Sequence, residues 1–233
     1  MNKNISIILA APQMGENIGA AARAMKNFGL HDLRIVSPRD GWPNEKARAN
    51  AALAVDVVDD ARVFESIKDA VSDLNYLYAT TSATRAMNKD YVVTKNLLSA
   101  FPDHMNVGII FGRESTGLTN EEISIANKII TIDTDPGCAS LNLAQAVLIV
   151  CYELFGRNER ADIANTQDLC TISDMTYFLD HLFNELSNTG FFKTEERREI
   201  MMRNITNIFT RIPKLSHNEV QTLRGVISHL TKG

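Results

Sequence analysis

The stretch ISIILAAPQMGENIGAAARAMKNFGL, residues 5–30, joins a short apolar run to a helical pattern through a glycine-bearing loop. The apolar run has the length and the isoleucine content of a buried strand. In the helical part, one face holds Ile18, Ala21, Ala22, Met25 and Phe28, and Arg23 lies roughly 140° around the axis from Ile18. We therefore predict a strand, then a helix with an outward arginine, closed by Gly29 just after its last turn.

The same alternation of apolar run and helical pattern continues along the first two thirds of the chain. Thr119 begins an S/T-x-x-E capping box that predicts the start of one of these helices. Strands that alternate with helices favour a mostly parallel sheet covered on both faces, which is an α/β fold. The expected strands are residues 5–11, 33–36, 75–81, 106–111 and 129–133.

Length and composition limit the classes of protein to which the chain can belong. The chain has 233 residues, of which 45% are hydrophobic and 22% charged. This is ordinary for a folded protein and long enough for one α/β domain of roughly 150 residues with an appendage. No stretch approaches the ~20 apolar residues of a membrane span, and the start of the chain is unlike a secretory signal, so we expect a cytoplasmic protein with no membrane contact.

Metal chemistry is not indicated by the cysteines and histidines. Cys138, Cys151 and Cys170 are odd in number and lack CxxC spacing, and the five histidines are scattered. We expect reduced thiols and no metal. Cys138 follows Pro136 and Gly137 in a loop, but no partner base accompanies it, so we interpret it as a small apolar residue and not as a nucleophile.

The last third of the chain differs from the rest in pattern and in charge. A polar stretch over residues 157–169 predicts a linker, and amphipathic helices are expected at residues 173–186, 195–209 and 219–230. Residues 193–233 carry eight basic and four acidic side chains, a net charge of +4. Because the whole chain has a net charge of −4, residues 1–192 have a net charge of −8. A local basic surface can contact phosphates, although a solvated helix face explains the charge equally well.

Three loops lie where the expected strands end, at residues 13–19, 111–118 and 134–143. Ligands of α/β proteins gather at the carboxyl ends of strands. None of the loops has the G-x-G-x-x-G or Walker spacing, and the chain holds neither H-E-x-x-H nor G-x-S-x-G. Their glycines and helix starts offer backbone N–H groups to a small polar ligand with adenine and ribose edges. Taken singly, each loop is equally well explained as a structural turn.

Taken in order, three stretches closely resemble the three motifs of the SPOUT class of RNA methyltransferases: Asn17–Met25, Ile110–Leu118 and Ser140–Ala146. Three stretches of the tail resemble the C-terminal extension of the TrmJ-like branch of the TrmH family: Thr189–Phe191, Phe209–Arg211 and Leu223–Val226. The resemblance thus spans nearly the whole chain.

This resemblance implies a SPOUT α/β-knot, in which a parallel sheet ends in a deep trefoil knot, followed by a small helical extension. It places the methyltransferase domain at residues 1–157, the linker at 158–172 and the extension, as a tRNA-binding or dimer-supporting part, at 173–233. It also implies a homodimer that uses S-adenosylmethionine to methylate a ribose 2′-hydroxyl of tRNA, at a pyrimidine in position 32 of the anticodon loop. Two alternatives stay open, a ribosomal RNA target and a catalytically silent RNA-binding protein on the same scaffold.

The resemblance also implies the site residues. Arg23 engages the target hydroxyl; because a guanidinium keeps its proton in proteins, we expect it to orient the ribose or phosphate and to stabilise developing alkoxide charge. Asn17 places Arg23 or the ribose; it is equally well explained as the N-cap of the first helix, and the two roles are compatible. Glu114 ties loops together or meets substrate. Ser140 caps the helix of the third loop and faces the cofactor, and Asn142 follows on the same turn.

The remaining implied positions fall into two groups. Those for S-adenosylmethionine are Thr81, Ser82, Ala83, Gly112, Ile132, Ala139, Ser140 and Leu141. Those for RNA are Arg85 in the loop after the third strand and, in the tail, Arg197, Arg198, Arg211 and Arg224.

Overall fold

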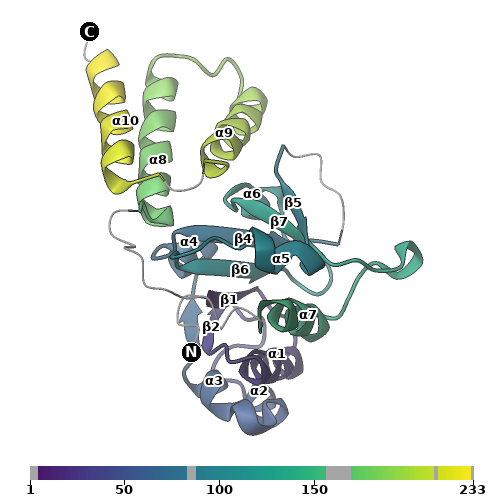
Figure 1. Ribbon diagram of the computed structural model, residues 1–233. Coiled ribbons are helices and arrows are strands. Elements are labelled where there is room, and N and C mark those ends of the chain that lie inside the picture. The colour runs from purple at the N-terminus through teal and green to yellow at the C-terminus, as the bar shows by residue number, and fades with distance from the viewer. Residues whose placement is uncertain (1–4, 83–87, 156–168, 213–214, 232–233) are drawn as a thin grey trace.

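In the part of the chain that the structure describes, a seven-stranded parallel sheet forms the centre (Figure 1). The computed structural model describes residues 5–82, 88–155, 169–212 and 215–231. All six strand pairs are parallel, in the order β3-β2-β1-β6-β4-β7-β5. The five predicted strands are confirmed, and two strands of three residues each were not predicted because they are too short to show a period. The strands are β1 (Ile5–Ala10), β2 (Asp32–Val36), β3 (Arg62–Phe64), β4 (Tyr76–Thr80), β5 (Tyr91–Val93), β6 (Val107–Phe111) and β7 (Lys128–Thr131).

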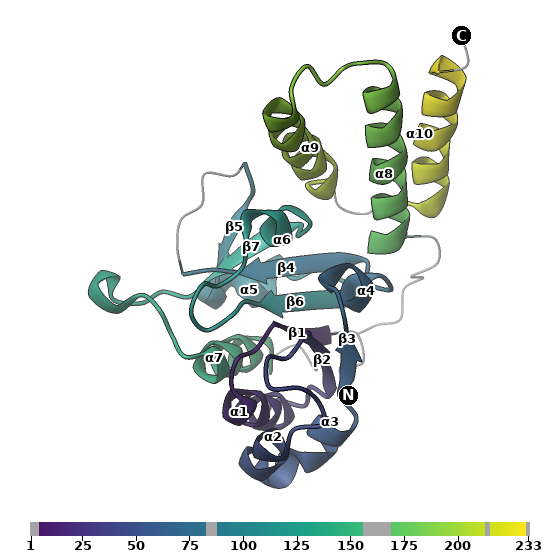
Figure 2. The ribbon, with the colours of Figure 1, turned by 180° about the vertical axis from the view of Figure 1, so that it is seen from behind.

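Helices cover both faces of this sheet, as Figures 1 and 2 show from opposite sides. Alternate residues of a strand point to opposite faces, so Ile7 packs in one buried cluster and Ile8 in the other. On the first face lie α1 (Gly15–Asn27), α2 (Glu45–Asn50), α3 (Val55–Asp59), α5 (Leu97–Ala100) and α7 (Leu143–Phe155). On the second lie α4 (Ile67–Val71) and α6 (Asn120–Ser124). Short 3₁₀ turns are η1 (Ala52–Ala54), η2 (Thr94–Asn96) and η3 (Pro136–Cys138).

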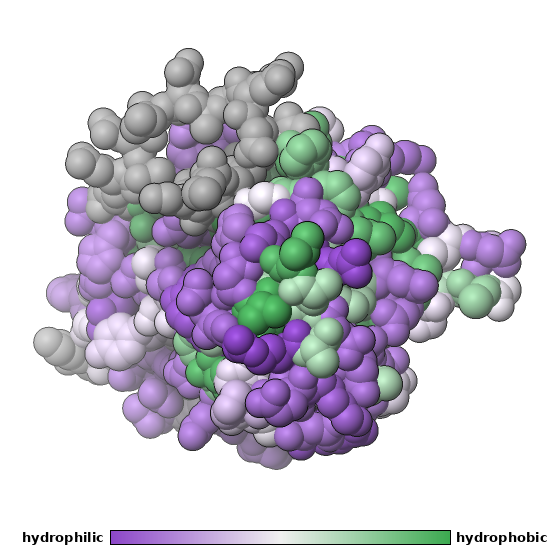
Figure 3. All heavy atoms as spheres, turned by 90° about the horizontal axis from the view of Figure 1, so that it is seen from below, coloured by the Kyte–Doolittle hydropathy of each residue, from purple (hydrophilic) through white to green (hydrophobic). Residues whose placement is uncertain are grey.

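Helix α1 packs against α2 at backbone distance because glycines face the contact. A Cβ built on Gly19 would lie 2.1 Å from the carbonyl oxygen of Ala47, and one on Gly15 would meet the side chain of Asn44 at the same distance. Gly29, with φ of +71°, ends α1 in the left-handed region as predicted. At this end of the molecule, a group of apolar side chains lies within a mostly polar surface (Figure 3).

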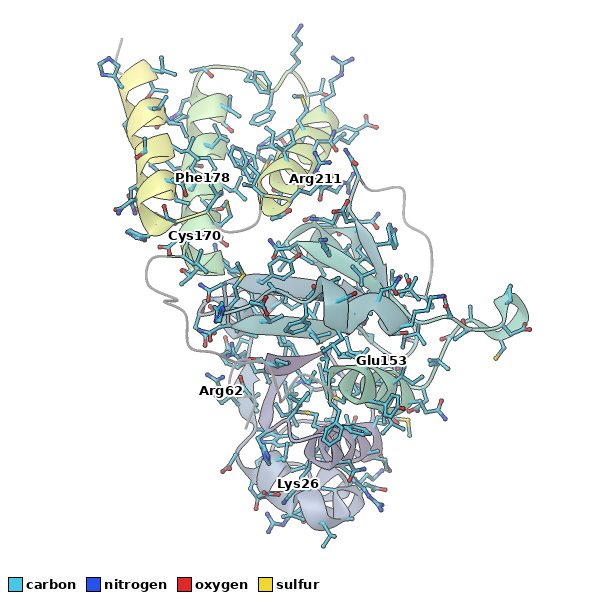
Figure 4. All side chains as sticks on the ribbon, in the orientation of Figure 1. Lys26, Arg62, Glu153, Cys170, Phe178 and Arg211 are labelled. Carbon is cyan, nitrogen blue, oxygen red and sulfur yellow. The ribbon has the colours of Figure 1, made fainter. Side chains whose placement is uncertain are left out.

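The C-terminal part forms a three-helix unit with its own core (Figure 4). Its helices are α8 (Ile172–Asn188), α9 (Glu195–Thr210) and α10 (His217–Leu230). All three predicted helices are confirmed, and capping boxes headed by Thr171 and Ser216 start α8 and α10 one or two residues earlier than the apolar pattern indicated. The Phe178 ring of α8 packs edge-on against Phe209 of α9, with ring centroids 4.7 Å apart.

The unit docks on the α4 and α6 side of the sheet through buried polar contacts. The Asn127 side chain donates to the Thr210 carbonyl over 2.7 Å. Lys89, which is only 6% exposed, donates from Nζ to the Ala126 carbonyl and, over 2.8 Å, to the Thr210 hydroxyl. Burial, and to a lesser extent the charge of Arg211, lowers the pKa of Lys89 from 10.5 to about 7. A neutral amine keeps two N–H donors, so both hydrogen bonds survive deprotonation.

We therefore expect the stability of the folded chain to increase as the pH rises above 7. Between about 7 and the unfolded-state pKa near 10.5, Lys89 is neutral when folded and protonated when unfolded. The unfolded state then binds more protons, so the free energy of unfolding grows by up to about 1.4 kcal/mol per pH unit from this group. Urea unfolding between pH 6 and 9 measures the slope. Lys89→Met, which cannot titrate, should show a flatter profile than the wild type; an unchanged profile would contradict the assignment.

Candidate active site

A pocket of about 270 Å³ lies at the carboxyl ends of the central strands. It is bordered by the ends of β4, β6 and β7 and by the loops that follow them. Its apolar residues include Phe111, Ile130 and Leu143, and its polar residues include Thr81 and Ser140. The lining residues are Thr80–Ser82, Phe111–Gly117, Ile130, Ile132, Ala139–Leu141, Leu143 and Ala146.

The loop after β6 is held rigidly in one shape. Gly117 adopts φ of +66°, and a Cβ on Gly112 would lie 2.3 Å from the Gly117 carbonyl carbon, so both positions require glycine. Arg113 makes two hydrogen bonds of 2.9 Å to the carboxylate of Glu122. Glu122 also closes the predicted capping box with Thr119 at the start of α6. The loop is thereby fixed to the helix behind it.

Three side chains join the three motif loops in one hydrogen-bond chain. Asn17 Nδ2 donates to Glu114 Oε1 over 2.8 Å, and Asn142 Nδ2 donates to Asn17 Oδ1 over 3.0 Å. Asn142 Oδ1 in turn accepts from the backbone N–H groups of Ala144 and Gln145 at the start of α7. A carboxylate only accepts, so Glu114 fixes the orientation of the Asn17 amide, which fixes that of Asn142.

Two capping predictions are corrected by this chain. Asn17 is not the N-cap of α1: Met14 occupies that position, and Asn17 is the third residue of the helix, buried, with its amide used across the loops. Ser140 does not cap the third-loop helix, because α7 begins only at Leu143 and Asn142 supplies the capping oxygen. In both cases a side chain that is able to cap lies close to a helix start, and the exact helix boundary decides its role.

Gln13 also belongs to this arrangement, although no role was predicted for it. Its backbone N–H donates to Glu114 Oε2 over 2.9 Å, and its side-chain amide donates to the Ser115 hydroxyl over 3.0 Å. Both carboxylate oxygens of Glu114 therefore have a donor. The only available signal was the place of Gln13 in the first loop; its partners lie about a hundred residues away along the chain.

The positions predicted for the cofactor lie together in space. The residues Thr81, Ser82, Gly112, Ile132, Ala139, Ser140 and Leu141 all line the pocket described above. Ala83 and Arg85 lie outside the described residues.

Arg23 has a different position from the other predicted catalytic residues. It is exposed on α1, six residues beyond Asn17, which corresponds to about 9 Å along the helix and about 120° around it. It is not among the described residues that line this pocket. The outward orientation predicted from the sequence is confirmed, and the structure does not bring Arg23 to the chain of Asn17, Glu114 and Asn142.

The predicted RNA-binding arginines of the tail occupy separate places. Arg197 is exposed near the start of α9, and Arg198 pairs with Glu195 over 2.7 Å. Arg211 follows the last turn of α9, close to the sheet domain (Figure 4). Arg224 instead stacks over the Tyr177 ring, 4.1 Å from its centroid, and so links α10 to α8.

All three cysteines are free thiols, and they differ in their exposure to solvent. Cys138 is exposed in η3, at the end of a loop that projects from the body of the molecule (Figure 1). Burial raises the pKa of Cys151 to about 12 and that of Cys170 to about 11, so both stay protonated. Within the described ranges, no group of three or more His, Cys, Asp or Glu is placed to hold a metal ion. Among the same residues, no helix is long and apolar enough to cross a membrane.

Comparison with known proteins covers the chain almost from end to end. A family model described as the SpoU rRNA Methylase family matches residues 4–152, and one described as the tRNA methyltransferase TrmJ, C-terminal domain, matches residues 173–233. A tRNA (cytidine/uridine/adenosine-2'-O-)-methyltransferase TrmJ of Pseudomonas aeruginosa is 31% identical, with 100% of this chain and 95% of the relative aligned. A tRNA (cytidine/uridine-2'-O-)-methyltransferase TrmJ of Photorhabdus laumondii is 33% identical, with 100% and 98% aligned.

Solved structures show the same likeness. The crystal structure of TrmJ from Z. mobilis superimposes with a TM-score of 0.87 at 39% identity, covering 97% of this chain and 98% of that one. A probable methylase family protein from Haemophilus influenzae gives a TM-score of 0.63 at 32% identity, covering 100% and 97%.

Proposed function

Because this chain belongs to the SpoU rRNA methylase family and carries a TrmJ C-terminal domain, we propose that it transfers a methyl group from S-adenosylmethionine to a ribose 2′-hydroxyl of tRNA. One observation carries the proposal: the relatives named as tRNA 2'-O-methyltransferases align with the catalytic part and the tail together. As the target we propose a pyrimidine at position 32 of the anticodon loop, in tRNA of the cytoplasm.

The pocket fits S-adenosylmethionine by its chemistry. Phe111, Ile132 and Leu143 offer apolar contact to an adenine ring, and the backbone of Ala139–Leu141 offers hydrogen bonds to its edge. The missing Cβ of Gly112 lets the loop backbone approach closely. When bound, the cofactor supplies a methyl group on a positively charged sulfur. We assign its binding to Thr81, Ser82, Gly112, Ile132, Ala139, Ser140 and Leu141, together with Ala83 outside the described residues.

The roles of the catalytic residues follow from what each side chain can donate or accept. Glu114, Asn17 and Asn142 hold the three loops in one arrangement, which positions the two reactants. Ser140 lies at the pocket with its side chain exposed, where its hydroxyl can meet the ribose or the donor. Arg23, a fixed cation, orients the ribose or its phosphate and stabilises the developing alkoxide.

We further propose that two copies of the chain form the working enzyme, with Arg23 of each acting at the pocket of the other. On α7, Leu148, Tyr152 and Phe155 are exposed, Tyr152 to 64%, and the rings of the last two pack against Phe28 of α1. Exposed apolar surface of this kind marks protein interfaces. The outward position of Arg23 on the neighbouring helix agrees with a role in a shared site.

Two structural proposals complete the assignment. We propose that the chain between β7 and α7 is threaded as a deep trefoil knot; in support, β7 lies between β4 and β5 while α7 packs against α1 on the other side of the sheet centre. We also propose the division into a catalytic domain at 1–157, a linker at 158–172 and an RNA-binding extension at 173–233. The RNA contacts that we propose come from Arg197, Arg198, Arg211 and Arg224 of the extension and from Arg85, which lies in the catalytic domain outside the described residues.

A methylation assay with radiolabelled donor tests the reaction and its substrate. Unmodified tRNA is expected to gain label in a nuclease-resistant 2′-O-methyl nucleotide, mapped by mass spectrometry to the anticodon loop. Ribosomal RNA serves as the competing substrate. Label found on a base would overturn the ribose assignment, label on ribosomal RNA alone would overturn the tRNA assignment, and absence of any transfer with bound donor would favour a silent RNA-binding protein.

A further inference from the structure

The segment between β2 and α2, residues 37–44, forms a wall beside the first motif loop. It leaves the sheet at the carboxyl end of β2, the edge at which the pocket also lies. Ser37 and Gly41 adopt φ of +44° and +77°, and these two left-handed residues turn the chain back toward the first motif loop. The backbone N–H of Arg39 then donates to the Pro12 carbonyl over 3.1 Å.

This bond makes the wall continuous with the residues around Glu114. Pro12 is followed by Gln13, whose N–H holds one carboxylate oxygen of Glu114. At the other end of the wall, Asn44 packs against Gly15 so closely that a Cβ there would lie 2.1 Å from Asn44 Oδ1. The wall is therefore held to Pro12 by a hydrogen bond and to Gly15 by close packing, which places its backbone beside the first motif loop.

Two cations extend from this wall and from the helix after it. Arg39 pairs with Asp40 over 2.8 Å, and Lys46 of α2 pairs with Glu16 of α1 over 3.3 Å. The Arg39 and Lys46 side chains are 58% and 68% exposed. Exposed ion pairs of this kind contribute little to stability, so each carboxylate is readily exchanged for another anion. A phosphate can take the place of the Asp40 carboxylate, because it too offers two oxygens to Nε and Nη2 of Arg39.

Arg39 lies within electrostatic reach of the loop that carries Glu114. The hydrogen bond to Asp40 and the charge of that carboxylate raise the pKa of Arg39, and the charge of Glu114 adds a smaller contribution, so Glu114 is within electrostatic reach. Both oxygens of Glu114 are already occupied by the Gln13 N–H and the Asn17 amide. Glu114 is thus held by the motif loops, and the hydrogen-bonded carboxylate of Arg39 is that of Asp40.

We propose that Arg39 and Lys46 form a phosphate-binding edge of the active site, which contacts the backbone of the RNA strand that carries the target ribose. The phosphodiester displaces Asp40 from Arg39 and Glu16 from Lys46. This inference rests on the proposed function, since the strand must pass Glu114 to bring its ribose to the pocket. These contacts position the strand without reading its sequence.

Variants of the full-length protein test this edge. Arg39→Ala and Lys46→Ala are each expected to weaken tRNA binding about 3- to 10-fold and to reduce the slope of log affinity against log salt by about one. Binding of S-adenosylmethionine, measured by calorimetry, should stay unchanged. Arg48→Ala is the matched control, because Arg48 lies on the same helix as Lys46 but pairs with Asp59 of α3. Melting temperatures show that each variant is folded.

A substitution that is expected to tighten tRNA binding distinguishes a phosphate contact of Arg39 from a purely structural role. Asp40→Asn removes the carboxylate that competes for Arg39, so it should tighten tRNA binding about 2-fold, whereas loss of a merely structural ion pair would not. Suppose that the wild type methylates tRNA, but that Arg39→Ala and Lys46→Ala bind tRNA with the same affinity as Arg48→Ala. The proposal of a phosphate-binding edge is then wrong, and the enzyme assignment stands. If the wild type transfers no methyl group to RNA, the enzyme assignment itself fails.

Discussion

Replacing Glu114 by alanine is expected to reduce the rate of methyl transfer by about 10²-fold, because it releases all three motif loops at once. The Gln13 N–H and the Asn17 amide lose their acceptor together. Asn17 is then free to turn, and Asn142, which donates to Asn17 while capping α7, loses its fixed orientation. Since the loop that carries Glu114 also lines the pocket, affinity for S-adenosylmethionine should fall as well.

Single-turnover methylation and calorimetry with the donor measure these two effects separately. Glu114→Gln is the more specific test, because glutamine has the same size as glutamate but one of its two terminal atoms is a donor. That nitrogen must face either the Gln13 N–H or the Asn17 amide, both of which are donors. We therefore expect Glu114→Gln to lose nearly as much activity as Glu114→Ala. Glu65→Ala removes an exposed carboxylate just after β3 and serves as the control. Full activity of Glu114→Gln would show that the direction of the hydrogen-bond chain is unimportant.

The sheet was predictable to the extent that each strand carried enough residues to show a pattern. The isoleucine-rich run of β1, the outward Arg23 and the capping box at Thr119 are local features, and local physical chemistry determines them. Strands β3 and β5 have three residues each and owe their conformation to the neighbouring strand. The same holds for the wall at Arg39, whose shape depends on the Pro12 carbonyl.

The sequence allowed us to predict which residues belong to the candidate site, but not which hydrogen bonds join them. The family resemblance pointed to Asn17, Glu114 and Asn142, yet these lie 97 and 125 positions apart along the chain, and no periodicity indicates that they bond to one another. An asparagine near a helix start ordinarily prefers the N-cap. Here two partners from distant loops satisfy the buried Asn17 amide, and this tertiary pairing overrides the local preference.

Replacing Arg23 by alanine is expected to reduce turnover by about 10²- to 10³-fold, the usual cost of removing a group that stabilises developing negative charge. Arg23 is exposed and does not line the pocket of its own chain, so donor binding and melting temperature should stay as in the wild type. Arg23→Lys should recover only part of the rate, because an ammonium lacks the two-pronged geometry of the guanidinium. Unchanged turnover of Arg23→Ala would remove Arg23 from the mechanism.

Mixing two inactive variants shows which pocket Arg23 serves. If Arg23 acts at the pocket of the second copy, a mixed dimer of Arg23→Ala and Glu114→Ala chains contains one site with both native residues. Random exchange makes half of the dimers mixed, so about a quarter of all sites, and of the wild-type activity, should return. If Arg23 acts on its own pocket, no site is complete and activity stays at the level of the separate variants. Arg23 is exposed on α1, the helix whose Phe28 packs against the exposed rings of α7, and this leads us to expect recovery.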